Sequence, residues 1–90
     1  MKSAISTVTE EYKILAKEYG AELDVKELEE YEGLEKEDFC LVISCGDFYF
    51  SVAMLKNKRE DLNAIEGIFK VAWRFLQRGA LERGFKKTSK

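Results

Sequence analysis

The central stretch of the chain predicts a β-hairpin, and this feature constrains the fold more than any other. Phe39 to Leu55 reads FCLVISCGDFYFSVAML, which is two apolar-rich runs around Gly46 and Asp47. Glycine accepts the positive φ that the first position of a two-residue primed turn requires. This turn fixes the register, so that eight side chains are predicted to share one strongly apolar face. They oppose each other as Cys45 with Phe48, Ile43 with Phe50, Leu41 with Val52, and Phe39 with Met54.

The other face of the hairpin is small and half polar, and we expect it to meet water or a partner. Cys40 and Cys45 lie on opposite faces because their spacing along the strand is odd. Five residues of strand separate them by about 17 Å, which is far beyond disulfide reach. Both are therefore expected to be reduced structural thiols. The second face holds Cys40, Val42, Ser44, Tyr49, Ser51 and Ala53.

A first helix is predicted before the hairpin. The segment TVTE, from Thr7 to Glu10, has the capping-box pattern, so regular helix is expected to begin at Val8. Gly20 is well placed to end it. The apolar stripe repeats at spacings of three and four residues through Ile5, Val8, Tyr12, Leu15 and Tyr19.

A longer helix is predicted to begin near Arg59 and to end near Gly79 or Gly84. At 100° per residue its apolar residues span an arc of roughly 160°, which Val71 and Ala64 extend toward about 200°. A helix lying on one sheet needs only about 100–140°. Its central stripe is formed by Leu62, Ile65, Phe69, Ala72 and Leu76.

The wide apolar arc of this helix predicts self-association. Trp73 and Phe75 lie on opposite edges of the arc, which we call its shoulders, so the sheet and the first helix should fully cover at most one of them. The other shoulder would be buried in a symmetric homodimer, where the same patch meets itself. The candidate residues for this contact are Ile68, Val71, Trp73 and Phe75.

Residues 21–30 allow two interpretations. As a strand, Leu23 and Val25 alternate with charged residues; as a helix, Asp24 would cap and Glu27 would close a capping box. A strand is favoured, because a lone two-stranded hairpin is marginally stable. Residues 31–38 then form an acidic connection.

Together these elements predict a single α+β domain over residues 1–90. Its three-stranded antiparallel sheet carries both helices on one face, in the order α-β-β-β-α. The tail at 86–90 is expected to be frayed. The chain has no long apolar run at its start and none long enough for a membrane span. We therefore expect a cytoplasmic protein without membrane partners.

The net charge of −2 hides a split between two parts of the chain. Residues 1–55 carry 5 basic and 13 acidic residues, whereas residues 56–90 carry 10 basic and 4 acidic residues. Two interpretations of this charge separation are open. The opposite charges can aid solubility and orient two copies of the chain in self-association, or the basic part can form an anion-binding surface on the last helix. The cations on or near the polar side of that helix are Arg59, Lys70, Arg74 and Arg78.

The order of elements and the stretch KNKREDLNAI resemble the double-stranded-RNA-binding domain, over roughly residues 8–78. That family has Lys-Lys-x-Ala-Lys at the start of its second helix. Lys58 and Arg59 match the first two basic positions, whereas Asp61 and Leu62 replace the alanine and the third lysine. The resemblance implies binding of duplex RNA through Lys56, Lys58, Arg59, Lys70, Arg74 and Arg78.

Motifs for catalysis are missing from the sequence. The chain has no histidine, its six glycines are scattered, and no serine or cysteine lies in a recognisable nucleophile motif. We therefore expect a non-enzymatic protein without a cofactor or a metal. Glu and Lys together number 24 against three Asn and Gln, which is typical of proteins from hot environments. The preferred hypothesis is a self-associating protein-interaction module, and the alternative is binding of double-stranded RNA.

Overall fold

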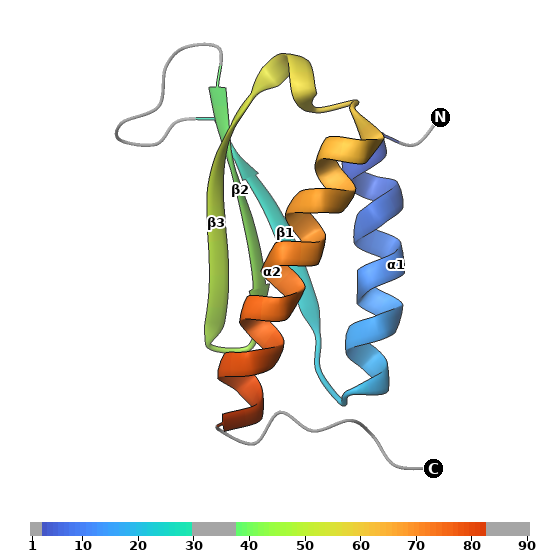
Figure 1. Cartoon of the computed structure of the whole chain (residues 1–90), viewed down its shortest axis with the longest axis vertical. Helices are drawn as coiled ribbons and strands as arrows, with labels where there is room; N and C mark the ends of the chain where they lie inside the picture. Colours follow the sequence, from blue (N-terminus) through green and yellow to red (C-terminus); the bar gives the residue numbers. More distant parts are fainter. Residues whose placement is uncertain (1–2, 30–37, 83–90) are drawn as a thin grey trace.

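The computed structural model shows a three-stranded antiparallel sheet with two helices packed against it (Figure 1). It describes residues 3–29 and 38–82, with side chains only as far as residue 79. The α+β class and the α-β-β-β-α order are confirmed. The predicted tail at 86–90 and residues 31–37 of the predicted acidic connection lie outside the described residues. The elements are α1 (Ala4–Glu18), β1 (Leu23–Leu28), β2 (Asp38–Cys45), β3 (Phe48–Leu55), the short 3₁₀ helix η1 (Lys56–Lys58) and α2 (Leu62–Glu82).

β2 is the central strand of the sheet, and β1 and β3 flank it. The predicted hairpin register is confirmed at every pair, from Cys45 opposite Phe48 to Phe39 opposite Met54. Gly46 has φ +63°, as the primed turn requires. The strand interpretation of this region is also confirmed, although β1 (Leu23–Leu28) is shorter than the predicted range of 21–30. β1 pairs with β2 in an antiparallel register that places Leu23 opposite Cys45.

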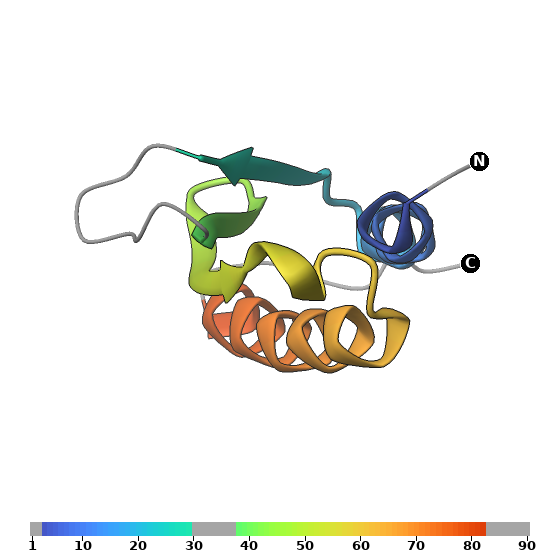
Figure 2. The ribbon, with the colours of Figure 1, turned by 90° about the horizontal axis from the view of Figure 1, so that it is seen from above.

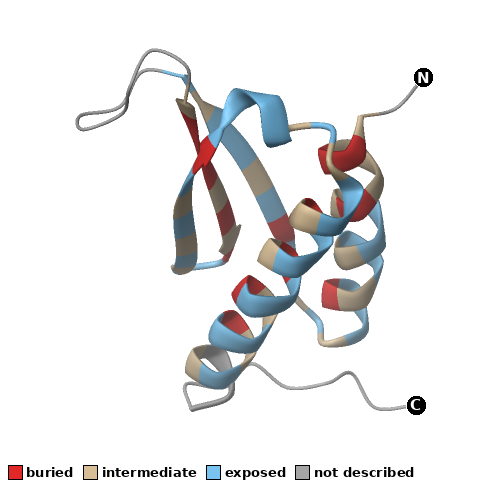
Figure 3. Ribbon diagram, turned by 45° about the horizontal axis from the view of Figure 1, so that its top comes forward, coloured by how far each residue is buried: buried red, intermediate tan, exposed pale blue. Residues whose placement is uncertain are grey.

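The core lies between the sheet and the helices. α2 lies against β2 and β3, and α1 lies beside α2 against β1 (Figure 2). Buried positions recur along both helices, with exposed positions between them (Figure 3). The apolar hairpin face therefore supplies the floor of the core, as its pattern predicted. The largest fully buried side chains are Val8, Phe39, Leu41, Ile43, Ile65, Phe69 and Leu76.

The start of α1 differs from the sequence prediction. Ser3 is the N-cap, and its Oγ accepts a hydrogen bond from the backbone N–H of Ser6 at 3.1 Å. The predicted start at Val8 is therefore wrong. Ala4 and Ile5 are 9% and 5% exposed, so one more helical turn buries two apolar side chains. The predicted end is close to the observed one, since the helix stops at Glu18, two residues before Gly20 at φ +75°.

The start of α2 also lies later than predicted, at Leu62 instead of near Arg59. Asp61 precedes the helix, and its Oδ1 accepts from the backbone N–H of Ala64 at 3.1 Å. Between β3 and α2 the chain forms η1 (Lys56–Lys58), where it turns from the end of the sheet toward the start of the helix (Figure 1). The helix continues past Gly79 to Glu82, the last described residue, and Gly84 lies outside the described residues.

Replacement of the α1 cap gives a first test. Ser3→Ala removes the acceptor for the Ser6 N–H, and we expect it to lower the free energy of unfolding by about 1 kcal/mol. Ser6→Ala is the matched control, because that bond uses only the backbone of Ser6. Urea unfolding followed by circular dichroism measures both. An equal effect of the two substitutions would contradict the assigned cap.

Candidate protein-interaction surface

The structure treats the two shoulders of α2 differently. Trp73 lies beside α1, with its ring centroid 6.1 Å from that of Tyr12 and 5.5 Å from that of Tyr19, both in edge-on geometry. Gln77 Nε2 also donates a hydrogen bond to the Tyr19 hydroxyl at 3.0 Å. This bond connects the next turn of α2 to the end of α1 as well. The Trp73 shoulder is therefore partly buried against the protein's own first helix.

The opposite shoulder faces outward. Val71 and Phe75 are each 56% exposed. The Phe75 ring lies 5.9 Å from the ring of Phe50 on β3, in a tilted arrangement. Ile68 lies further in and is partly buried against the core. Of the four residues predicted for self-association, Val71 and Phe75 are therefore exposed, whereas Ile68 and Trp73 are partly buried against the core. Self-association itself stays a prediction.

The outer edge of β3 adjoins this shoulder. Among the described residues no strand pairs with that edge. All eight residues of Phe48–Leu55 are uncharged, with Asp47 before them and Lys56 after them. An unpaired, uncharged edge of this length is a template for pairing with another strand, and proteins usually block such edges with charges, proline or bulges.

The hairpin geometry shows which backbone groups this edge presents. In a two-residue hairpin the residues next to the turn exchange hydrogen bonds, and every second residue then points its N–H and C=O away from the partner strand. The side chains of these residues are all exposed, and they lie on the open face of the sheet. The outward residues are Tyr49, Ser51, Ala53 and Leu55.

A shallow hollow marks where the strand edge and α2 meet. Its volume is about 410 Å³, and Asp47, Phe48, Tyr49, Phe50, Ser51 and Phe75 line it. Its lining is mostly aromatic and largely open to solvent, and it offers a place for an apolar side chain from outside. We call the outer edge of β3 together with Val71 and Phe75 the β3–α2 surface.

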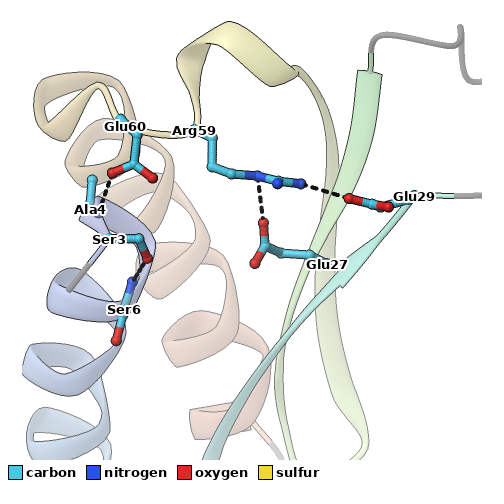
Figure 4. A network of polar contacts seen from close by, with 7 residues as sticks. All are labelled: Ser3, Ala4, Ser6, Glu27, Glu29, Arg59 and Glu60. Carbon is cyan, nitrogen blue, oxygen red and sulfur yellow. Dashed lines mark hydrogen bonds and ion pairs between the residues drawn. The ribbon is translucent and has the colours of Figure 1, made fainter. Parts of the chain in front are cut away.

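Arg59 holds a polar network at the other end of the sheet (Figure 4). Its Nε lies 3.0 Å from Glu27 Oε1 as an ion pair without hydrogen-bond geometry, and its Nη2 donates to Glu29 Oε1 at 3.2 Å. The guanidinium carbon lies 4.7 Å from the ring centroid of Phe39. A cation placed on an aromatic face and paired with carboxylates links the chain before α2 to β1. Beside it, Glu60 Oε2 accepts from the N–H of Ala4 at 3.3 Å.

This network corrects the expectation, taken from the family resemblance, that Lys58 and Arg59 lie at the start of the second helix. Neither belongs to α2, and the Arg59 side chain is only 31% exposed. Lys58 is exposed and lies 3.8 Å from Asp61 Oδ2. The other predicted nucleic-acid contacts are exposed, and no ion pair joins them to another residue within the described part of the chain: Lys56, Lys70, Arg74 and Arg78.

The two cysteines are free thiols on opposite faces of β2, as predicted, although Cys40 is only 6% exposed on the face that was expected to meet water or a partner. Cys45 is 3% exposed on the helix side, and burial raises the pKa of its thiol above the ordinary value of 9.0. Burial also raises the pKa of Tyr12, with smaller contributions from Glu11 and Glu66. Both raised pKa values favour the protonated side chain. A thiol that is harder to deprotonate is a poorer nucleophile, so the shift of Cys45 does not indicate catalysis.

Alkaline pH should therefore weaken the fold. The folded chain holds the Cys45 proton more tightly than the unfolded chain, so this stabilising contribution is complete below the unfolded pKa. It is lost as the pH rises through the folded pKa, and we expect urea midpoints to fall above about pH 9. Cys45→Ala should reduce the slope of that loss. An unchanged slope would mean that the thiol titrates normally.

Sequence reasoning missed part of the β3–α2 surface. Tyr49 and Leu55 are 64% and 53% exposed at the strand edge. The hairpin pattern predicted Tyr49 on the half-polar face but did not indicate that its strand lies at an edge of the sheet. The available signal was the uncharged run between Asp47 and Lys56. That signal becomes informative only once the strand order shows that this strand lies at an edge.

No protein-family model, curated protein or solved structure matches this chain. Its likeness to the double-stranded-RNA-binding domain is one of element order. Within residues 3–29 and 38–82, no helix is both long enough and apolar enough to cross a membrane. The same residues contain no group of three or more His, Cys, Asp or Glu side chains placed to hold a metal ion.

Proposed function

We propose that the chain is a non-enzymatic protein-interaction module that self-associates through the β3–α2 surface. The single observation that carries this proposal is the 56% exposure of Phe75 beside an uncharged strand edge with which no strand pairs in the described part of the chain. The Trp73 shoulder supports it by contrast, because α1 covers that side of the same helix. Val71 and Phe75 thus form an exposed apolar shoulder on the side of α2 opposite Trp73, whereas the first residue of the helix, Leu62, is exposed elsewhere at 46%.

Burial of this surface would stabilise a small domain. A 90-residue chain buries only about 60–65% of its unfolded surface, so its own core gives modest stability. Full burial of a phenylalanine side chain contributes about 1.5–3 kcal/mol. In a symmetric dimer each such contact occurs twice, because the same patch meets itself.

The test is the solution mass measured by light scattering. We expect the unmodified protein to be a dimer and Phe75→Lys to be a folded monomer, with unchanged circular dichroism. Ile14→Lys is the matched control, since Ile14 is an exposed apolar residue, 69% accessible, on α1. It should remain a dimer. A monomer at high concentration, or equal dissociation by both substitutions, would refute the proposal.

Binding of duplex RNA is the second candidate function. Four exposed cations without an ion pair among the described residues favour it: Lys56, Lys70, Arg74 and Arg78. Arg59 argues against it, because Glu27 and Glu29 already neutralise its charge. Titration with duplex RNA at two salt concentrations decides the question, since phosphate contacts lose affinity steeply with salt. Arg74→Glu with Arg78→Glu should abolish binding, whereas Lys26→Glu on β1 should not, and absence of binding at low salt rejects this function.

A further inference from the structure

We propose that the occupant of the β3–α2 surface is a second copy of this chain, bound edge to edge with β3 antiparallel to β3. The two sheets would then join into one continuous sheet of six strands. This inference rests on the proposed function and specifies its partner and geometry. Self-association and the edge-to-edge geometry can be tested separately, by solution mass and by crosslinking.

The charges of the two sheet edges decide which edge pairs. β1 reads LDVKEL, so three of its six residues are charged, whereas the eight residues of β3 carry no charge. Charged side chains on an edge strand discourage pairing with another strand. Arg59 also lies against β1 through Glu27 and Glu29. Of the two edges, β3 is the one left open to another strand.

The hydrogen-bonding pattern of β3 is self-complementary. Its outward residues are the odd-numbered ones from Tyr49 to Leu55. In an antiparallel pair, an outward residue must oppose an outward residue, and opposed side chains lie on the same face. A twofold axis at Ser51 or at Val52 meets both conditions, and it places the helices of both copies on the same side of the joined sheet.

The charges at the two ends of β3 select the antiparallel orientation. Asp47 precedes the strand and Lys56 follows it, and both are exposed. Antiparallel pairing brings Asp47 of each copy close to Lys56 of the other, so that two attractive contacts form. Parallel pairing would place Asp47 beside Asp47 and Lys56 beside Lys56, which is destabilising.

The helix shoulder fits the same arrangement. Phe75 lies beside Phe50, which is on the helix-facing side of β3 near the hairpin turn. With the axis at Ser51, Phe50 would oppose Val52 of the second copy; with the axis at Val52, it would oppose Met54. Either register extends the apolar floor under Phe75 across the interface. The exposed ring would then be buried together with the strand edge.

Disulfide crosslinking tests the geometry. Cys40 and Cys45 are buried, so an added cysteine on the edge is the accessible thiol. An axis at Ser51 predicts rapid crosslinking of Ser51→Cys with itself, and an axis at Val52 predicts crosslinking of Ser51→Cys with Ala53→Cys. Lys26→Cys on β1 is the control, because at about 4.8 Å per strand two copies of β1 would lie roughly 24 Å apart.

Reversal of the end charges tests the orientation. Asp47→Lys or Lys56→Asp alone should weaken dimerisation about tenfold, and the double substitution should restore it. A dimer by light scattering that neither crosslinks at these positions nor responds to the single reversals would overturn the edge-to-edge geometry and leave the proposed function standing. A monomeric unmodified protein would overturn both.

Discussion

Leu41→Asp is expected to unfold the protein. Leu41 lies on the central strand with 0% exposure, on the face that the helices cover. A carboxylate there would have no cation to pair with among the core side chains, which are all apolar. Burial of an unpaired charge costs several kcal/mol, which is comparable to the whole stability of a domain of this size. Circular dichroism should show loss of the cooperative thermal transition.

The adjacent residue gives a matched control. Val42→Asp introduces the same charge one position along the same strand, but on the open face of the sheet. There it lies opposite Lys26 of β1, so a favourable cross-strand pair replaces an apolar contact. We expect a change of less than about 1 kcal/mol in the free energy of unfolding. If the two substitutions were equally damaging, the assignment of the faces would be wrong.

Phe69→Ala is the second substitution with a large expected effect. Phe69 is 1% exposed, and its ring centroid lies 5.4 Å from that of Tyr12, so it joins α2 to α1 above the sheet. Truncation leaves a cavity in the core between α1, α2 and the sheet. The expected loss is about 3–5 kcal/mol in the free energy of unfolding, measured by urea denaturation.

Phe75→Ala compares the same substitution at an exposed site of the same helix. The Phe75 ring contacts Phe50 and solvent, so its removal should cost less than about 1 kcal/mol in the free energy of unfolding of the isolated chain. Both variants should be compared at a concentration where each is monomeric, because a dimer contributes its own stabilisation. A similar loss in both variants would mean that Phe75 belongs to the core.

The two faces of the hairpin follow from local chemistry. The side-chain period of a strand is two, and the turn fixes which residues oppose each other, so the register needs no information from elsewhere in the chain. Gly46 supplies the positive φ of that turn. The four pairs from Cys45 and Phe48 to Phe39 and Met54 could therefore be predicted from the sequence, and the structure confirms them.

The helix starts could not be predicted in the same way. Thr7 matches a capping-box pattern, and so the sequence favoured a start at Val8, yet Ser3 is the cap. A cap contributes only about 1 kcal/mol, and this is less than what burial of Ala4 and Ile5 contributes. Capping by Ser3 and capping by Thr7 would contribute similar free energies, so the burial of Ala4 and Ile5 in the first turn decides where the helix begins.

Sequence patterns predicted the α+β class, the hairpin register and the apolar stripe of α2, together with an apolar arc too wide for the sheet and α1 to cover fully on both shoulders. Each of these depends on a period of side-chain direction or on turn chemistry, and both act over a few residues. Three features emerge from the folded arrangement alone: Trp73 packs against α1 while Phe75 is exposed, Arg59 is held by Glu27 and Glu29, and β3 lies at an edge of the sheet that the described residues form. These properties depend on which elements become neighbours. The packing of the whole core determines those neighbours, and no single stretch of sequence does so.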